Sequence, residues 1–329
     1  MKIETLTIII FFFTFFLNYF LLKIYLIKGV NFKNLLDFPG NLKTHKIKAL
    51  KAGGIFSLFI CSIIISYLYF FYEINYFSEN KFWFLLVSIL ILGIICFIDD
   101  LYNISKFIRL LLQLSLVFLS TSTLRNGLGY DFIPTKLEIL LIIYFWVYHI
   151  NITNFYDGVD DLFVKKNFFI LLFIFISSVL GYLPISNLLI SILLIGIILS
   201  FYPFNKHPAK IFFGDTGSIV FGYLIAWMLI NLAINGYLAA SISIILFYHM
   251  DVSFTLLKRI LQKKSIFHRH RDFYFLKLYD SLSDHKKFYK KFNFIILFGF
   301  VFSLLLLFYN NLFFLIFPLL VYLWILKKN

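Results

Sequence analysis

The chain has few charged residues and almost no cysteine. Asp, Glu, Lys and Arg make up 14% of its 329 residues, against about 25% in a typical soluble domain. Its two cysteines, Cys61 and Cys96, both fall inside apolar runs, so the sequence predicts neither a disulfide framework nor a thiolate metal site. It also shows no internal repeat, no low-complexity linker and no second domain. A soluble globular domain and a small disulfide-rich fold are therefore excluded.

The sequence instead contains long apolar runs. Hydrophobic residues make up 61% of the chain, and its mean hydropathy is +0.91. These runs lack the period-two alternation of a membrane β-barrel. We therefore predict an all-α polytopic membrane protein, a single domain over residues 1–329 with about 10–11 transmembrane helices. The eleven candidate spans are Thr5–Leu26, Gly53–Phe71, Phe82–Ile98, Phe107–Thr121, Leu137–Ile150, Phe168–Tyr182, Ile185–Tyr202, Ser218–Ile234, Tyr237–Leu257, Phe292–Phe308 and Leu312–Leu326.

The basic residues are distributed unevenly between the gaps that separate these spans. Of the 30 Lys and Arg residues, 25 fall in alternate gaps on one side. By the positive-inside rule, that side is cytoplasmic, the N-terminus lies outside and the C-terminus is cytoplasmic. The net charge of +14 does not indicate nucleic acid, because the basic loops are tethered to helices at both ends. We expect a multi-pass protein of the cell inner membrane.

Aspartate follows the same sidedness as lysine. Eleven of the twelve Asp residues fall on the predicted cytoplasmic side, whereas all four Glu residues fall on the other. Acidic residues contribute little to membrane topology, so this asymmetry indicates a catalytic face. The predicted catalytic loops are residues 27–52, 99–106, 151–167, 203–217 and 258–291.

The central loop reads NITNFYDGVDDL and begins at Asn151. On a helical turn Asp157 and Asp160 would share one face, about 5–6 Å apart. Carboxylates that close resist joint ionisation unless a cation lies between them. The alternative is a solvated loop, but three further polar islands repeat the pattern and favour a cation site.

Two of those islands lie at predicted helix ends. Asp99 and Asp100 end a helix, where the helix dipole disfavours anions by about 0.3–1 kcal/mol each, so Lys106, Arg109 or a metal must offset them. The segment FFGDTGS begins a helix, and its backbone N–H groups would form an anion cradle. Asp215 in this segment would hold a cation that bridges the cradle to a phosphate, or would serve only as an N-cap.

The first and last loops are basic. In the first, six lysines accompany Asp37 and His45, and they face either a phosphate or anionic lipid headgroups. The last loop carries eleven Lys and Arg residues with His268, His270 and His285. Asp251 precedes it inside an apolar run, which makes Asp251 a functional-site hypothesis.

Together these residues indicate phosphoryl transfer. Carboxylates with few imidazoles and no free thiolates select Mg²⁺ or Mn²⁺ over zinc. Mg²⁺ is usually held by one or two carboxylates together with substrate phosphates, and phosphoryl transfer depends mainly on positioning and charge neutralisation. At a membrane surface, we expect at least one substrate to be a lipid phosphate.

At this point the sequence resembles the polyprenyl-phosphate N-acetylhexosamine-1-phosphate transferases of the glycosyltransferase 4 type. Five motifs occur in the family's order, and FIDDLYNISKFIRLLLQ, NITNFYDGVDDL and FFGDTGS match closely. The match is closer to the enzymes that initiate O-antigen and common antigen than to the peptidoglycan translocase. The first loop keeps Asp37, Pro39, His45 and Gly53–Gly54, with Lys48 and Leu50 at family prolines.

The chain departs from the family elsewhere. In HRHRDFYFLKL, which resembles the histidine-rich motif, Phe273 and Tyr274 stand where histidines are usual. Asp161 replaces a usual glycine. The altered histidine motif favours a plain UDP-N-acetylhexosamine donor over a muramyl pentapeptide donor.

The resemblance implies Mg²⁺-dependent transfer of N-acetylhexosamine-1-phosphate from a UDP-sugar to undecaprenyl phosphate. UMP is released, and a lipid-linked cell-envelope glycan such as lipopolysaccharide O-antigen is started. The implied catalytic residues are Asp99, Asp100, Asp157, Asp160 and Asp215, with Asp215 and Asp157 as metal ligands. The implied substrate-binding residues are His45, Lys106, Arg109, Asn151, Asn154, Phe212, His270 and Arg271. Within this set Phe212 would stack on uracil, and His270 and Arg271 would hold the diphosphate.

Two other functions compete with this reading. An intramembrane aromatic prenyltransferase also uses Asp-rich loops, but with different spacing, and FFGDTGS has no place in it. A transporter or flippase would place charged residues near the bilayer midplane and show two related halves. Asp251 and His149 are the candidates for such a position in the membrane. The sequence leaves the sugar and the oligomeric state open, and a homodimer is compatible with it.

Overall fold

The computed structural model describes residues 2–31, 33–40, 43–71, 82–102, 104–124, 134–266, 268, 270–282 and 284–327. The prediction of sidedness also used residues outside these ranges, namely Glu73, Glu79, Lys81, Arg125, Asp131, Arg269 and Lys328. The chain divides into two compact units: Met1–Pro39 with Thr44–Asn235, and Gly40–Lys43 with Gly236–Asn329.

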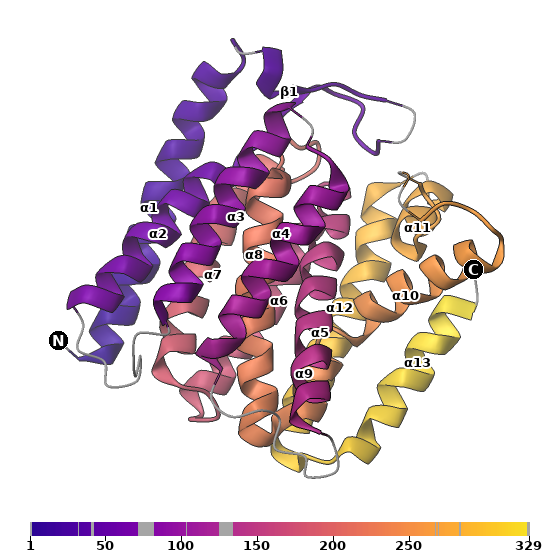
Figure 1. Ribbon diagram of the computed structural model, residues 1–329. Coiled ribbons are helices and arrows are strands. Elements are labelled where there is room, and N and C mark those ends of the chain that lie inside the picture. The colour runs from indigo at the N-terminus through magenta and orange to yellow at the C-terminus, as the bar shows by residue number, and fades with distance from the viewer. Residues whose placement is uncertain are drawn as a thin grey trace. The chain divides into compact units, whose positions relative to one another are not determined.

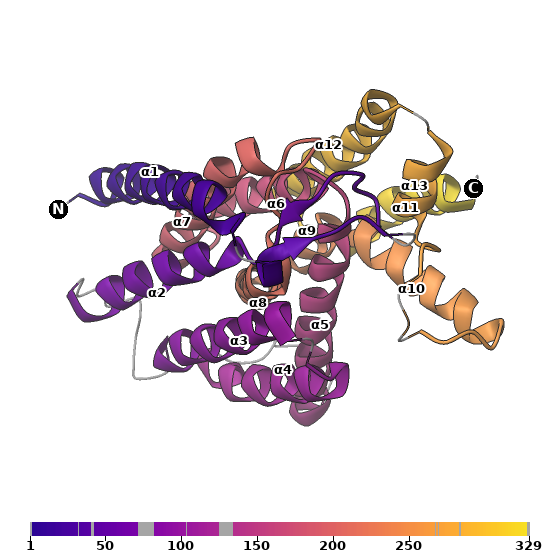
Figure 2. The same ribbon diagram turned by 90° about the horizontal axis from the view of Figure 1, so that it is seen from above.

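The first unit is a bundle of eight long helices built around α8. Its elements are α1 (Ile3–Gly29), η1 (Lys33–Leu35), β1 (Leu36–Asp37), β2 (Ala49–Leu50), α2 (Gly54–Phe71), α3 (Phe82–Tyr102), α4 (Lys106–Ser120), η2 (Thr121–Thr123), α5 (Thr135–Phe155), η3 (Tyr156–Gly158), α6 (Leu162–Val179), α7 (Ile185–Asn205) and α8 (Gly214–Leu232). Figure 1 shows these helices running side by side. Figure 2 shows α8 enclosed by α2, α3, α5, α6 and α7, with α1 outside α7 and α4 outside α3.

Helix α8 is the core of this unit. Every residue from Thr216 to Ile230 is buried, as expected of a helix that is apolar on all faces. Two of its polar contacts lie inside the bundle: the Tyr223 hydroxyl pairs with Ser120, and the Trp146 indole N–H donates to the Tyr223 carbonyl at 2.9 Å. Side chains of α4 and α5 thus pair with the middle of α8.

The second unit contains α9 (Leu238–Ser243), α10 (Leu246–Leu261), α11 (Tyr274–Ser281), α12 (His285–Tyr309), η5 (Leu312–Leu315) and α13 (Ile316–Lys327). The segment η4 (Ala233–Tyr237) precedes it, with Gly236 at φ +93°. Within the unit Phe247 of α10 packs its ring against Phe292 of α12 and Tyr322 of α13. Aromatic side chains thus fill the space between these three helices.

The all-α membrane class is confirmed. Among the described residues, seven helices are long and apolar enough to cross a membrane: Ile3–Gly29, Trp83–Tyr102, Thr135–Gly158, Leu162–Val179, Ile185–Asn205, Gly214–Ser243 and His285–Tyr309. Two shorter apolar helices, Gly54–Phe70 and Leu312–Lys327, accompany them. The sidedness of the termini is not tested by the fold and stays a prediction.

The predicted ninth span, Tyr237–Leu257, is wrong as a single helix. It is divided at Ile244–Ile245 into α9 and α10. The first part of α10, Phe247 to Val252, packs inside the unit and lies largely buried, whereas Leu257, Ile260 and Leu261 in its second part are exposed. Hydropathy alone does not detect such a break, because both halves are apolar.

Helices α2 and α8 meet at two glycines. A Cβ atom on Gly54 would overlap the Cα and N atoms of Gly217 and lie 2.9 Å from the carbonyl oxygen of Phe213. Backbone atoms cannot move aside as a flexible side chain can, so this contact requires glycine. The close approach brings the first loop against the start of α8.

We predict that Gly54→Ala lowers the free energy of unfolding by about 1–3 kcal/mol, because it overpacks the α2–α8 contact. Thermal unfolding of the purified protein in detergent measures the change. Gly158→Ala is the matched control, since no atom lies within 4 Å of the added Cβ. Equal stability of the two variants would contradict the contact.

Candidate active site

Two carboxylates occupy the N-terminus of α8. The N–H groups of Asp215 and Thr216 donate to Oδ1 and Oδ2 of Asp100 at 3.0 and 3.1 Å, and the Thr216 hydroxyl donates to Oδ2 at 2.7 Å. The N–H of Gly214 donates to Oδ2 of Asp157 at 3.1 Å. The first-turn N–H groups and the positive end of the helix dipole stabilise both anions.

The anion cradle predicted at FFGDTGS is present, and the anions that it binds in this structure are carboxylates. Side chains from α3 and η3 accept the hydrogen bonds of its N–H groups. The predicted bridge from this cradle through a cation to a phosphate stays a prediction. Gly214 has φ +75°, and a Cβ there would lie 2.7 Å from Oδ2 of Asp100. The absence of a side chain at Gly214 therefore allows the Asp100 carboxylate to approach the backbone.

Arg109 supplies the cation that the sequence required near Asp99. Its Nη1 donates to Oδ2 of Asp99 at 2.6 Å and also pairs with Oδ2 of Asp215. Asp99 additionally accepts the N–H of Ile104. Of the three cations considered from the sequence, the structure places Arg109 at this position. Asp100 is stabilised differently, by the amides of α8.

Asp99, Asp100, Asp157 and Asp215 thus form one group, which we call the carboxylate cluster. Its members come from α3, η3 and α8 and are distant in sequence. Their side chains remain partly accessible; those of Asp99 and Asp215 are 11% and 25% exposed. The predicted convergence of these residues is confirmed, and the cluster is open to a substrate.

Asp160 lies apart from Asp157. The chain leaves its helical path at Val159, with φ −130° and ψ 134°, so the predicted shared helical face is wrong. The Asp160 carboxylate is buried and accepts hydrogen bonds from His207 Nδ1 at 2.8 Å and the N–H of Ala209 at 3.1 Å. It ties the central loop to the turn that precedes α8. A catalytic role for Asp160 stays a prediction.

The two predicted asparagines link helices around the cluster. Asn151 donates to Gln113 Oε1 of α4 at 2.8 Å, and Asn154 Oδ1 accepts from the Ser218 hydroxyl of α8 at 3.0 Å. Sequence reasoning missed Gln113 and Ser218 as their partners. Gln113 could have been noticed as a lone amide inside an apolar run. Lys106 is exposed at the first position of α4, and its contact with substrate stays a prediction.

The first loop is attached to the segment before α8. Strands β1 and β2 pair antiparallel, and Leu50 of β2 exchanges hydrogen bonds with Lys210 and Phe212. His45 contacts Asp37 through Nε2 at 3.0 Å, and its ring centroid lies 4.9 Å from that of Phe212. The predicted substrate-binding residues His45 and Phe212 are therefore brought together.

Thr44 is a further residue that sequence reasoning missed in the first loop. Its hydroxyl donates to the Gly158 carbonyl at 2.6 Å. This bond joins the first loop to η3, next to Asp157, so the loop is held on the same side of the bundle as the carboxylate cluster.

His270 and Arg271 belong to the second unit. Arg271 pairs with Asp280, with its Nε 3.0 Å from Oδ2. Burial and the nearby charges of Arg259 and Lys277 lower the pKa of His270, against the opposing effect of Asp272, so the imidazole is neutral near pH 7. The predicted contact of His270 and Arg271 with a diphosphate stays a prediction.

Asp251 has a structural partner in the same unit. Its carboxylate is buried and accepts the N–H groups of Tyr274 at 2.7 Å and Phe275 at 3.3 Å. These are the first two residues of α11, so Asp251 caps that helix from α10. Its burial inside an apolar run, which suggested a functional site, is accounted for by this contact.

The cluster suits a hard cation by its chemistry. It offers carboxylate oxygens, which Mg²⁺ and Mn²⁺ prefer. Among the described residues, no group of three Asp, Glu, His or Cys side chains is already arranged to hold a metal. Arg109 lies between Asp99 and Asp215 in this structure. A cation held by Asp157 and Asp215 would therefore share the Asp215 carboxylate with Arg109 or replace that contact.

We predict that Asp100→Ala lowers the free energy of unfolding by about 1–3 kcal/mol, because it leaves N–H groups at the start of α8 without an acceptor. Thermal unfolding in detergent checks this. Asp280→Asn, at an exposed ion pair, is the control and should change stability by under about 1 kcal/mol. Similar losses of stability in both variants would argue against the role of Asp100 as an acceptor at the start of α8.

Asp161 occupies a backbone position that favours glycine. Its φ is +53°, its N–H donates to Asn205 Oδ1 at 3.0 Å, and its carboxylate pairs with Lys165 at 3.0 Å. Burial raises the pKa of this carboxyl, against the opposing effect of Lys165. The residue that replaces the family's usual glycine thus retains a glycine-like conformation.

We predict that Asp161→Val destabilises the protein by about 1–2 kcal/mol, the cost of a left-handed conformation for an L-residue. Asp161→Gly should change stability by under about 1 kcal/mol, since relief of the backbone offsets the loss of one ion pair. Unfolding curves of the two variants distinguish the backbone effect from the side-chain effect. If glycine costs as much as valine, the side-chain contacts dominate over the backbone.

The comparisons with known proteins cover the part of the chain that contains this site. Residues 82–233 match the model of glycosyl transferase family 4. The chain is 29% identical over 247 residues to a probable undecaprenyl-phosphate N-acetylglucosaminyl 1-phosphate transferase of Bacillus subtilis, covering 70% of this chain and 66% of that protein. It is 33% identical over 166 residues to the phospho-N-acetylmuramoyl-pentapeptide-transferase of Streptococcus mutans, covering 45% and 48%.

A corresponding transferase of Clostridium botulinum is 29% identical over 214 residues, covering 58% of this chain and 64% of that protein. The chain thus matches between about half and two thirds of the length of these relatives. The region matched by the family model contains the entire carboxylate cluster and Arg109. This part of the chain, residues 82–233, is therefore similar to glycosyl transferase family 4.

Proposed function

We propose that the protein transfers a sugar-1-phosphate, specifically an N-acetylhexosamine-1-phosphate, from a UDP-sugar to undecaprenyl phosphate and releases UMP. The observation that carries the proposal is the carboxylate cluster around the start of α8, with Arg109 between Asp99 and Asp215. The match of residues 82–233 to the family model and the printed activity of the Bacillus subtilis relative support it. The reaction would start a lipid-linked cell-envelope glycan such as O-antigen.

The reaction forms one bond and breaks one. An oxygen of the lipid phosphate forms a bond to the phosphorus that carries the sugar, and the bond from that phosphorus to the bridging oxygen breaks. The bridging oxygen leaves with UMP. A phosphate monoester is largely dianionic at pH 7, so the nucleophile needs no base. Asp99 would then orient the lipid phosphate through Arg109 rather than remove a proton from it.

The main barrier is repulsion between two anionic substrates. Arg109 is the cation already at the cluster, and Lys106 stands at the start of the same helix. Bound Mg²⁺ would neutralise charge on the diphosphate, and Asp157 and Asp215 are the residues that would hold it. Release of Asp215 from Arg109 would free the guanidinium for a substrate phosphate.

The first loop would supply the nucleotide site. The Phe212 ring lies beside His45 and is only partly buried, so it offers an aromatic face on which uracil could stack. Asn151 and Asn154 would shape the floor of the site through their contacts with α4 and α8. The charge distribution of the loops favours a cytoplasmic site in the inner membrane.

The experiment that tests this function is a UMP-release assay. Purified protein with undecaprenyl phosphate and Mg²⁺ is given a panel of UDP-sugars, and UMP should appear with at least one UDP-N-acetylhexosamine. Release that also occurs without the lipid phosphate would indicate hydrolysis instead. No release with any donor in the panel would count against the proposal.

We predict that Asp215→Asn lowers kcat by at least about 100-fold, because it removes a charge that the transition state requires. The measurement is UMP release under saturating substrates. Glu4→Gln, at an exposed residue in the first turn of α1, is the charge-matched control and should retain activity. A near-normal kcat for Asp215→Asn, with an unchanged unfolding temperature, would remove Asp215 from the chemistry.

A further inference from the structure

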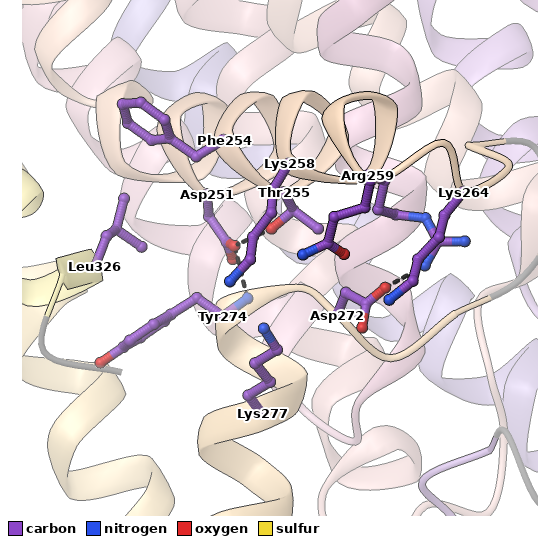
Figure 3. Close-up of a pocket in the computed structure, with 11 residues that line it drawn as sticks. Asp251, Phe254, Thr255, Lys258, Arg259, Lys264, Asp272, Tyr274, Lys277 and Leu326 are labelled. Carbon is purple, nitrogen blue, oxygen red and sulfur yellow. Dashed lines mark hydrogen bonds and ion pairs between the residues drawn. The ribbon is translucent and has the colours of Figure 1, made fainter.

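The second unit contains a cavity of about 300 Å³ that the proposed transfer reaction does not use. Helix α10, the turn after it, helix α11 and the end of α13 line it. Lys258, Lys264 and Lys277 contribute their side chains, and Phe254 and Leu326 add apolar surface. We call this cavity the lysine pocket (Figure 3).

Polar contacts between α10, the turn after it and α11 hold the frame of the lysine pocket. Asp251 of α10 accepts two N–H groups at the start of α11, as described above. Arg259 donates through Nε to the Ser265 carbonyl at 3.0 Å and pairs with Asp272. These contacts fix α10, the following turn and α11 against one another, so the positions from which the lysines extend are set by the fold.

The two acidic side chains of the pocket already have partners. Asp272 is paired with Arg259, and Asp251 accepts the N–H groups at the start of α11. The side chains of Lys258, Lys264 and Lys277, by contrast, form no hydrogen bond or ion pair with any residue that the structure describes. In Figure 3 the side chains of Lys258 and Lys277 extend from α10 and α11 toward the same space.

Three cations around one cavity repel one another, and an anion between them removes that repulsion. Ammonium groups on flexible stems are usual partners of phosphate, to which they act as point charges. The volume of about 300 Å³ accommodates a phosphodiester headgroup rather than a simple halide. The charge and size of the pocket therefore favour a phosphate group.

The edge of the pocket is apolar. Its lining includes Phe254, which is 46% exposed, and Leu326. Leu257, Ile260 and Leu261 are also exposed on the same helix, outside the pocket lining. Exposed apolar residues in such a row mark a surface that contacts lipid in a membrane protein. A ligand that joins a phosphate to hydrocarbon would satisfy both parts of the pocket, the lysines and the apolar edge.

We propose that the lysine pocket binds a phosphate group presented by the headgroup of an anionic membrane lipid. The site is separate from the predicted diphosphate contacts, because neither His270 nor Arg271 lines it. The proposal does not depend on the transferase activity, and it assigns α10 and α11 a role in anchoring to lipid.

Native mass spectrometry of the purified chain in detergent tests the site. Phosphatidylglycerol is titrated against the wild type and against a variant with Lys258→Gln, Lys264→Gln and Lys277→Gln. The matched control carries Lys286→Gln, Lys287→Gln and Lys290→Gln, which removes the same charge from exposed lysines of α12. Far-ultraviolet circular dichroism establishes that each variant is folded, and the three single variants are measured as well.

We expect each single substitution in the pocket to raise the apparent Kd for phosphatidylglycerol by about fivefold, with a larger rise in the triple variant. The control should bind as the wild type does, and phosphatidylcholine should bind weakly to all of them. Equal Kd values for the pocket and control variants would overturn the site. Glycerol 1-phosphate that binds as tightly as the lipid would overturn the lipid as the source of the phosphate.

Discussion

The first unit depends on the charge complementarity between the N-terminus of α8 and the carboxylates of Asp100 and Asp157. Four acidic side chains gathered in a membrane protein would repel one another strongly if they were left unpaired. Here the helix amides bind two of them and Arg109 binds the other two. This pairing makes the cluster possible, and it also positions the cluster at the end of the most buried helix.

The surrounding structure serves this arrangement. The glycines at positions 54 and 217 let α2 approach α8, and strand β2 pairs with the segment before α8. Asn154 and Ser218 join α5 to the same helix turn. Because each contact fixes the start of α8 from a different direction, the acidic groups are held in place before any substrate arrives. Such preorganisation is what phosphoryl transfer requires of a protein.

The second unit uses its charges differently. Its acids cap helices or pair with arginine, which leaves lysines around a cavity with an apolar edge. Asp251 illustrates the difference: an acid inside an apolar run suggests chemistry, but its carboxylate stabilises a helix start instead. Partners close in space, rather than the residue type, determine whether a buried acid serves chemistry or structure.

The sequence by itself determined the helical membrane class and carried the motifs that resemble glycosyl transferase family 4, because apolar runs and short motifs are local properties of the chain. It also indicated which acids belong to the site, since Asp99, Asp100, Asp157 and Asp215 all stand at ends of apolar runs. Only the tertiary structure decided how those acids are neutralised. Asp100 accepts amides that are 115 and 116 residues away, and Asp160 turns from Asp157 toward His207. The division of the predicted ninth span likewise follows from packing. These features depend on contacts between distant segments, and residue type and local spacing carry no information about which distant partner a side chain will meet.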